Sequence, residues 1–253
     1  MNEPIIQLPT QFKILLIGDN CTDVYQYGVV DRISPEAPVP VFQFVNEEQR
    51  PGMAGNVQEN LLVLGCAVDF ITGNTSIKTR LIDTRSKQQI VRIDQDMISA
   101  TVTLPNNIDY DAVVISDYNK GSVSYELLEE IIATAKCPVF IDTKKTDLAR
   151  LQGAWVKINE LEYSKIKSEC TGLIVTRGSK GASIIHHNIE YGAPKVEVVD
   201  VTGAGDTFLS ALVYGYLEEG SMPTAIKFAI QAGAVTVQQM GVYAPTLEEI
   251  ICV

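Results

Sequence analysis

VEVVDVTGAGDTFLSALVYGY, residues 196–216, joins a β-rich run to a glycine turn and then to an apolar helical pattern that begins at Asp206. Such a turn points its backbone N–H groups at one spot, where the helix dipole also favours an anion. These groups belong to Gly203, Ala204, Gly205 and Asp206. The segment therefore predicts a cradle for an oxyanion or a phosphate. A carboxylate at that helix start can also take a proton from a neighbouring hydroxyl, as in-line phosphoryl transfer requires. The alternative interpretation is that Asp206 only caps a helix after an ordinary turn.

Short, nearly continuous apolar runs alternate with helical patterns along the rest of the chain. The expected strands cover residues 13–18, 112–116, 138–142, 155–159 and 173–176, and the expected helices cover residues 55–65, 124–136, 207–219 and 224–240. Strands that are apolar on both faces are typical of parallel sheets covered by helices. The pattern predicts one α/β domain over residues 1–253, with a doubly wound, mainly parallel sheet.

Two segments, at about residues 24–48 and 75–98, break this alternation. They mix polar and apolar residues, with many β-branched ones and little helical periodicity. We expect them to form a small, separate antiparallel sheet, with an edge or loop at Pro35, Pro38 and Pro40 because proline cannot donate to a ladder. A projecting sheet with exposed edges needs a cover, which a second copy of the chain would supply in a homodimer.

Composition narrows the range of partners. The 253 residues include 20 Lys and Arg against 31 Asp and Glu, a formal net charge of −11. Such an acidic chain offers no broad basic face to a nucleic acid or an anionic membrane. No window approaches 18 uninterrupted apolar residues, and the first ten residues lack a secretion-signal pattern, so we expect a cytoplasmic location. The five cysteines are scattered and the two histidines are adjacent, which indicates neither a disulfide framework nor a zinc site.

The common nucleotide-binding fingerprints are missing from the sequence. It contains no G-x-x-x-x-G-K-[ST], and Gly18 is followed by Asp19, Asn20 and Cys21 rather than by G-x-G-x-x-G. This disfavours P-loop enzymes and dinucleotide dehydrogenases. Asp19 and Asp23 instead follow the first strand at its carboxyl end, where open α/β sheets bind ligands. Carboxylates there suit a polyhydroxylated ligand; the alternative for either one is a loop cap.

Two motifs carry a family resemblance. DVTGAGDT (200–207) resembles the carboxy-terminal signature of the ribokinase-like (PfkB) carbohydrate kinases, and RPGMAGNVQENLLVLGCAVDFITG (50–73) resembles their amino-terminal signature. Within that family, RISPEAPVPV (32–41), SDYNKGSV (116–123), IDTK (141–144) and KINELEY (157–163) look most like the kinases of D-glycero-D-manno-heptose 7-phosphate. The resemblance covers nearly the whole chain. It implies a ribokinase-like fold in which the small sheet is a lid over the sugar.

The resemblance also implies roles for individual residues. Asp206 would be the base, and the transferring phosphoryl group would be held by the backbone of Gly203, Ala204 and Gly205. Asn159 and Glu162 would organise Mg²⁺ and the ATP phosphates, largely through water, as a hard cation prefers. The nucleotide-side loop is matched by Thr176, Arg177, Gly178 and Gly181. The sugar would be bound by Asp19, Asp23, Gly52 and Asn56. In some members of the family a monovalent cation binds near the backbone that corresponds to residues 200–202. The sequence alone does not decide whether this chain binds such a cation.

The phosphate already on the substrate needs local cations in this acidic chain. Candidates on the lid segments or after a strand end are Arg32, Lys78, Arg80, Arg92 and Lys120. Lys78 and Arg80 share one face of a strand, so together they can grip a phosphate dianion. The alternative is that these are solvated edge charges that discourage sheet pairing.

The chain also departs from the family pattern. Gly73 leads directly into the lid strand, where the family usually has another helix and strand, and residues 166–173 are too short for a further helix. Ile230 stands where the most similar kinases tend to have Asn beside the nucleotide. We interpret the protein as a kinase that needs ATP and Mg²⁺ and phosphorylates the anomeric hydroxyl of the heptose 7-phosphate, on the route to a nucleotide-activated heptose. Two alternatives stay open: a kinase for another sugar or sugar phosphate, and a non-catalytic regulator that binds sugar or nucleotide.

Overall fold

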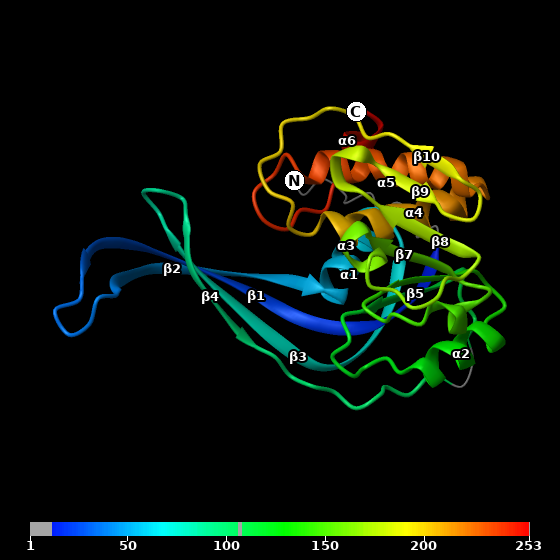
Figure 1. Ribbon diagram of the computed structural model, residues 1–253, viewed down its shortest axis with the longest axis horizontal. Coiled ribbons are helices and arrows are strands. Elements are labelled where there is room, and N and C mark those ends of the chain that lie inside the picture. The colour runs from blue at the N-terminus through cyan, green and yellow to red at the C-terminus, as the bar shows by residue number, and fades with distance from the viewer. Residues whose placement is uncertain (1–11, 106–107, 253) are drawn as a thin grey trace, which may run out of the picture.

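The computed structural model describes residues 12–105 and 108–252, which form a ten-stranded mixed sheet with helices packed on it (Figure 1). The strand order is β10-β9-β8-β7-β6-β5-β1-β3-β4, and β2 pairs with β1 outside this path. The strands are β1 (Lys13–Ile33), β2 (Pro40–Met53), β3 (Ala67–Asp83), β4 (Gln89–Gln95), β5 (Ala112–Asp117), β6 (Val139–Thr143), β7 (Trp155–Asn159), β8 (Gly172–Thr176), β9 (Ala182–Ile184) and β10 (Ile189–Tyr191). The helices are α1 (Ala54–Val63), α2 (Tyr125–Thr134), α3 (Glu160–Tyr163), α4 (Ala204–Glu219), α5 (Met222–Thr236) and α6 (Leu247–Ile251). Parallel pairing joins β8, β7, β6, β5, β1 and β3 in turn, which confirms the expected doubly wound, mainly parallel sheet.

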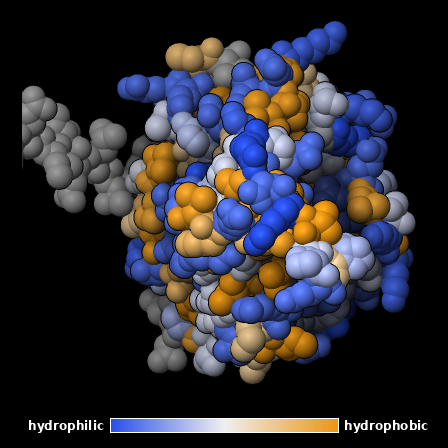
Figure 2. Space-filling model, turned by 90° about the vertical axis from the view of Figure 1, so that its left-hand side faces the viewer, coloured by the Kyte–Doolittle hydropathy of each residue, from blue (hydrophilic) through white to orange (hydrophobic). Residues whose placement is uncertain are grey.

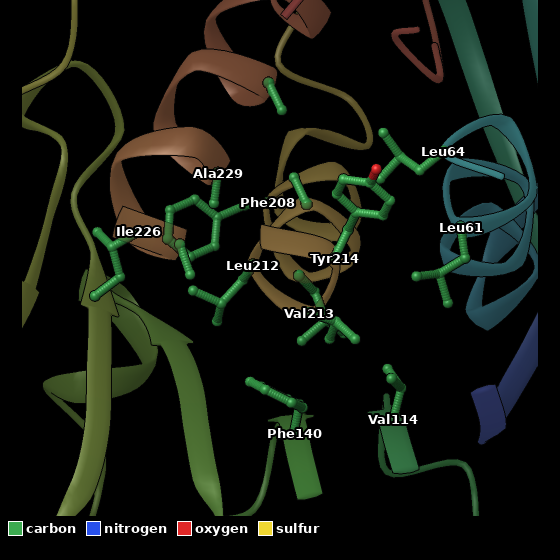
Figure 3. Close-up of a cluster of buried hydrophobic side chains, with 14 of the residues drawn as sticks. Leu61, Leu64, Val114, Phe140, Phe208, Leu212, Val213, Tyr214, Ile226 and Ala229 are labelled. Atoms are coloured by element: carbon green, nitrogen blue, oxygen red, sulfur yellow. The ribbon is translucent and has the colours of Figure 1, made fainter. Parts of the chain in front are cut away.

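Alternate residues of the central strands build two hydrophobic cores, one on each face of the sheet. Ile14 of β1 belongs to the core under α1, α4 and α5, whereas the next residue, Leu15, belongs to the core under α2. Figure 3 shows the first core, in which side chains of α1, α4 and α5 surround Val114 of β5 and Phe140 of β6. Both of these side chains are fully buried. Burial on both faces explains why the central strands read as continuous apolar runs in the sequence.

The lid is the outer half of the same sheet. β1 and β3 run as single strands of 21 and 17 residues from the core into a projecting arm, paired in parallel from Lys13 and Ala67 to Gly28 and Asp83. β2 and β4 flank the arm with antiparallel pairing (Figure 1). The segments at about residues 24–48 and 75–98, which the sequence predicts to form a lid, lie in this projecting arm, but the expectation of a separate sheet was wrong, and the central pair of the arm is parallel. The reason is that neither long strand is interrupted between core and lid.

The two shortened connections that the sequence indicated are both present. β3 passes through Gly73 into the lid without an intervening helix, and residues 164–171 connect α3 to β8 without one. Among the described residues, no strand lies beside the outer edge of β3 between Ala67 and Gly73. The same described residues include no helix that is long and apolar enough to cross a membrane.

Candidate active site

Asp206 lies in the first turn of α4. This helix begins at Ala204 after Gly203, whose φ of 79° is left-handed. A Cβ on Gly203 would lie 2.8 Å from the side-chain nitrogen of Asn56, so both the backbone angle and the close packing require glycine. The first turn of a helix leaves its N–H groups without helical partners. Asp206 therefore lies at a helix start of the kind that can hold an anion, although the N–H of Ala204 donates to the carbonyl oxygen of Val201 at 3.3 Å in this structure.

Both carboxylate oxygens of Asp206 accept a hydrogen bond. Nδ2 of Asn56, on α1, donates to Oδ2 at 2.9 Å, and the hydroxyl of Tyr118, just after β5, donates to Oδ1 at 2.9 Å. Asp206 is only 6% exposed, and this burial raises its pKa to about 6, although the hydrogen bond from Asn56 acts in the opposite direction. A carboxyl group with a pKa near neutrality is suited to take a proton from a hydroxyl.

A buried lysine supports the glycine turn. Nζ of Lys157, on β7, donates to Oδ2 of Asp142, on β6, at 2.7 Å and to the carbonyl oxygen of Gly205 at 3.2 Å. The side chains of Lys157 and Asp142 are 5% and 8% exposed. The sequence reasoning did not select Lys157, Asp142, Tyr118 or Lys144 as site residues. Asp142, Tyr118 and Lys144 lie at or just after the carboxyl ends of β5 and β6, and that position was the available signal for them; Lys157 lies in the middle of β7, where a charged residue in a buried strand was the signal.

A cavity of about 660 Å³ opens beside the turn. The ends of β6, β7 and β8 contribute polar lining, including Lys144, Asn159 and Thr176. Helices α4 and α5 contribute apolar lining, including Phe208 and Ile230. This volume and mixture of surfaces are of the kind that holds a small organic ligand the size of a nucleotide.

The predicted nucleotide-side loop divides between the cavity and its surroundings. Thr176, Gly178 and Gly181 line the cavity, whereas Nε of Arg177 lies 3.6 Å from Oε1 of Glu160. Arg177 therefore braces the loop against α3 in this structure.

Asn159 and Glu162 cap the start of α3. Oδ1 of Asn159 accepts the N–H of Glu162 at 2.9 Å, and Oε2 of Glu162 accepts the N–H of Asn159 at 2.8 Å. Oε1 of Glu162 pairs with Lys144, and Asn159 borders the cavity. A carboxylate and an amide oxygen are ligand types that suit Mg²⁺, which binds through few protein oxygens and several waters. In this structure each of these oxygens already has a protein partner, so the two residues could hold the ion largely through water.

Asp23 and Arg80 form an ion pair at the root of the lid. Their side chains are largely buried, and the Arg80 guanidinium also lies 5.3 Å from the ring centre of Tyr25. A Cβ on Gly52 would lie 2.3 Å from Oδ2 of Asp23, so this glycine leaves the room that the carboxylate occupies. The sugar-side residues Asp23, Gly52 and Arg80 are therefore brought together.

Asp19 holds the loop after β5. Its Oδ2 accepts the backbone N–H groups of Tyr118 and Lys120, both at 2.9 Å, and its Oδ1 accepts that of Ser122 at 3.2 Å. The side chain is almost fully buried. In this structure Asp19 acts as a loop cap, and through the loop it positions Tyr118.

The predicted phosphate-binding cations do not all lie together. Lys78 and Arg80 extend from β3 at the root of the lid, where Lys78 lies 5.9 Å from the ring centre of Tyr118. Lys120 and Arg92 each form an ion pair with an aspartate. Arg32 is exposed near the outer end of β1, at the far end of the arm (Figure 1). Within one chain, the structure therefore brings Lys78 and Arg80, but not Arg32, to the root of the lid.

Comparison with known proteins places the chain among sugar kinases. The pfkB family carbohydrate kinase profile matches residues 71–250. The chain is 34% identical to the bifunctional protein HldE of Nitratiruptor sp., over 94% of this chain and 64% of that protein. It is 30% identical to the HldE of Helicobacter acinonychis, over 94% of this chain and 65% of that protein. The chain thus spans a little less than two thirds of these relatives. The alignment with the Nitratiruptor protein runs over 299 positions, whereas this chain has 253 residues. That relative therefore has residues inside the matched region that this chain lacks.

Solved structures agree on the fold. Ribokinase from Thermotoga maritima superimposes with a TM-score of 0.71 at 17% identity, over 96% of this chain and 99% of that one. Arabidopsis thaliana ribokinase, solved with ribose and ATP, gives a TM-score of 0.69 at 17% identity, over 95% and 98% of the two chains. The predicted ribokinase-like fold is confirmed, and the chain belongs to the PfkB family of carbohydrate kinases.

Proposed function

We propose that this carbohydrate kinase transfers the γ-phosphate of ATP to the anomeric hydroxyl of D-glycero-D-manno-heptose 7-phosphate. The observation that supports it best is the position of Asp206, a buried carboxyl group with a pKa of about 6 beside a nucleotide-sized cavity. Kinases of this family use ATP, typically with Mg²⁺. The choice of heptose 7-phosphate rests on the motif resemblance in residues 116–123 and 157–163.

In the proposed reaction, Asp206 takes the proton of the acceptor hydroxyl while the hydroxyl oxygen attacks the γ-phosphorus. The bond from that phosphorus to the bridging oxygen breaks, and ADP leaves with the bridging oxygen. The N–H groups at the start of α4 hold the negative charge that develops on the phosphoryl group. Lys157 keeps the turn in place through the carbonyl of Gly205 and adds positive charge next to it. When bound, Mg²⁺ neutralises charge on the ATP phosphates, and Asn159 and Glu162 would hold it, largely through water. Catalysis then rests on positioning and electrostatics.

We assign the sugar to the space between α1 and the root of the lid. Asp23 would offer its carboxylate to the sugar hydroxyls, and Gly52 leaves room for that carboxylate. Asn56 would border the sugar while its amide nitrogen stays on Asp206 and its amide oxygen accepts from Asn60. Lys78 and Arg80 would bind the 7-phosphate as a charge-assisted pair, with Arg80 exchanging part of its contact with Asp23 for the dianion. Closure of the lid over this space would exclude water from the reaction.

A homodimer through the lid is the assembly we propose. Exposed apolar side chains on its strands are between 44% and 62% accessible: Ile33, Phe44, Val45, Val91 and Ile93. Figure 2 faces this end of the molecule and shows hydrophobic surface interleaved with hydrophilic side chains. A second lid would cover such surface and the open strand edges. A mass of one chain in light scattering would contradict this assembly.

A second candidate function is a binder without catalysis. It is favoured by the two shortened connections and by Ile230 in the cavity wall, because both remove or change surfaces that contact ligands.

One assay separates the two. ADP release is measured with Mg·ATP and heptose 7-phosphate, fructose 6-phosphate, ribose or no acceptor, with Asp206→Asn as the control. We expect turnover that requires a sugar phosphate, is fastest with heptose 7-phosphate and is lost in Asp206→Asn while the melting temperature is kept. No turnover, with a sugar phosphate still raising the melting temperature, would favour the binder. Repeating the assay in potassium and in tetramethylammonium buffers tests the monovalent cation.

A further inference from the structure

Tyr118 occupies the place at Asp206 that an acceptor hydroxyl must take. Its hydroxyl lies 2.9 Å from Oδ1, while Asn56 holds Oδ2. A hydroxyl that gives its proton to a base starts from the same separation, about 2.6–3.2 Å. Because Asp206 is almost fully buried, little of its carboxylate is left for approach from another direction.

The ring of Tyr118 contacts the surroundings of both substrates. Nζ of Lys78, from the lid, lies 5.9 Å from the ring centre, and Nζ of Lys144 lies 5.0 Å from it. The ring also lines the nucleotide cavity. On the sugar side, the backbone N–H of Tyr118 is held by Asp19. The neighbours of this side chain therefore belong both to the cavity and to the root of the lid.

The hydroxyl of Tyr118 is a hydrogen-bond donor and not a competing base. Burial and the nearby carboxylates of Asp206 and Asp142 raise the pKa of this phenol well above its usual value. It therefore stays protonated at neutral pH and covers Asp206 without taking part in proton removal.

We propose that Tyr118 is a placeholder that covers Asp206 until the sugar arrives and thereby suppresses hydrolysis of ATP by water. The proposal rests on the kinase function above. If the cover is removed, a water molecule takes its place and gives a proton to Asp206 as its oxygen bonds to the γ-phosphorus. The bond from that phosphorus to the bridging oxygen breaks, and the products are ADP and inorganic phosphate. Tyr118 acts through Asp206, so it is a positioning residue.

Tyr118→Phe keeps the ring and removes the hydroxyl. With Mg·ATP and no acceptor, we expect phosphate release to rise about tenfold over the wild-type rate, roughly the value of one lost hydrogen bond. Tyr110→Phe is the matched control, because the Tyr110 hydroxyl donates to Asp69 at 2.8 Å away from the site. It should leave phosphate release unchanged. Adding Asp206→Asn to Tyr118→Phe should abolish the increase.

Phosphate release that stays at the wild-type rate in Tyr118→Phe, or an increase that survives Asp206→Asn, would overturn the proposal. If Tyr118→Phe folds poorly, Tyr118→Leu replaces it in the same assay, and its melting temperature is measured to check that it is folded. Heptose 7-phosphate turnover is measured in parallel. Its absence would contradict the proposed substrate, whereas an Asp206-dependent rise in hydrolysis would still support the placeholder.

Discussion

The variant Asn56→Leu tests how a neighbouring hydrogen bond sets the pKa of Asp206. The amide of Asn56 donates the hydrogen bond at Oδ2 and opposes the effect of burial on the pKa of Asp206. A hydrogen bond to a charged group contributes about 1.5–3 kcal/mol, and about 1.4 kcal/mol corresponds to one pKa unit. Its loss should therefore raise the pKa of Asp206 from about 6 to roughly 7–8. The base works in its ionised form, so the acidic limb of kcat/KM should move upward by roughly one to two pH units.

The measurement is kcat/KM for the sugar phosphate across about pH 5 to 9, which reports the ionisation of the free enzyme. Asn74→Leu is the matched control, because its amide donates at 3.1 Å to the carbonyl of Ile98 and not to a carboxylate. That variant should keep its acidic limb near pH 6. A folded Asn56→Leu enzyme whose acidic limb coincides with that of the wild type would refute the assignment of Asp206 as the titrating base.

Three further predictions follow from single contacts. The apolar cavity wall around Ile230 offers few polar contacts to the purine of a nucleotide, so kcat/KM for ATP and for GTP should differ by about tenfold or less. A difference above 1,000-fold, measured from initial rates, would contradict this prediction. The variant Lys157→Met leaves the Asp142 carboxylate buried without its cation, so the free energy of unfolding, measured by heat or urea, should fall by about 3–5 kcal/mol. The double variant Lys157→Met with Asp142→Leu should recover part of that loss. Hydrogen bonds from the backbone of Ser86 and Val30 lower the pKa of Asp83 to about 2, so its contribution to stability is complete above about pH 4 and is lost as the pH falls toward 2. Asp83→Asn should flatten the fall in melting temperature over that range, and an unchanged fall would count against this role.

The central strands could be predicted from the sequence because burial on both faces leaves a local signature. The run at residues 112–116 is almost wholly apolar and matches β5 closely, and the run at residues 155–159 matches β7 although Lys157 and Asn159 interrupt it. The lid segments were located by a different signal, because their polar and apolar residues alternate without helical periodicity. Its pairing could not be predicted, because the parallel register of β1 with β3 joins residues more than 50 positions apart.

The candidate site was predicted only where a local motif marks it. The glycine turn and Asp206 follow from one short segment with a physical reason for each residue. Tyr118 and Lys157 lie far from that segment in the chain; Tyr118 follows the end of β5, and Lys157 lies in the middle of β7. Their roles arise from the order of β5, β6 and β7 in the sheet, which a single sequence does not display.

The shortened connections and the catalytic network use different parts of the fold, and this separation determines what the shortening can affect. Asp206 is held by α1 and by the loop after β5, whereas one missing segment belongs beyond Gly73 on β3. If the sugar binds where we propose, loss of a wall beside β3 would remove contacts that distinguish one sugar from another, but it would leave Asp206 and its hydrogen-bond partners in place. We therefore expect broader sugar specificity rather than loss of phosphoryl transfer. The kcat/KM values for heptose 7-phosphate and for hexose phosphates should lie within about 100-fold of each other, because contacts of that kind discriminate only modestly. Strict selection of one sugar phosphate, by about 10,000-fold or more, would mean that other residues rebuild the missing wall.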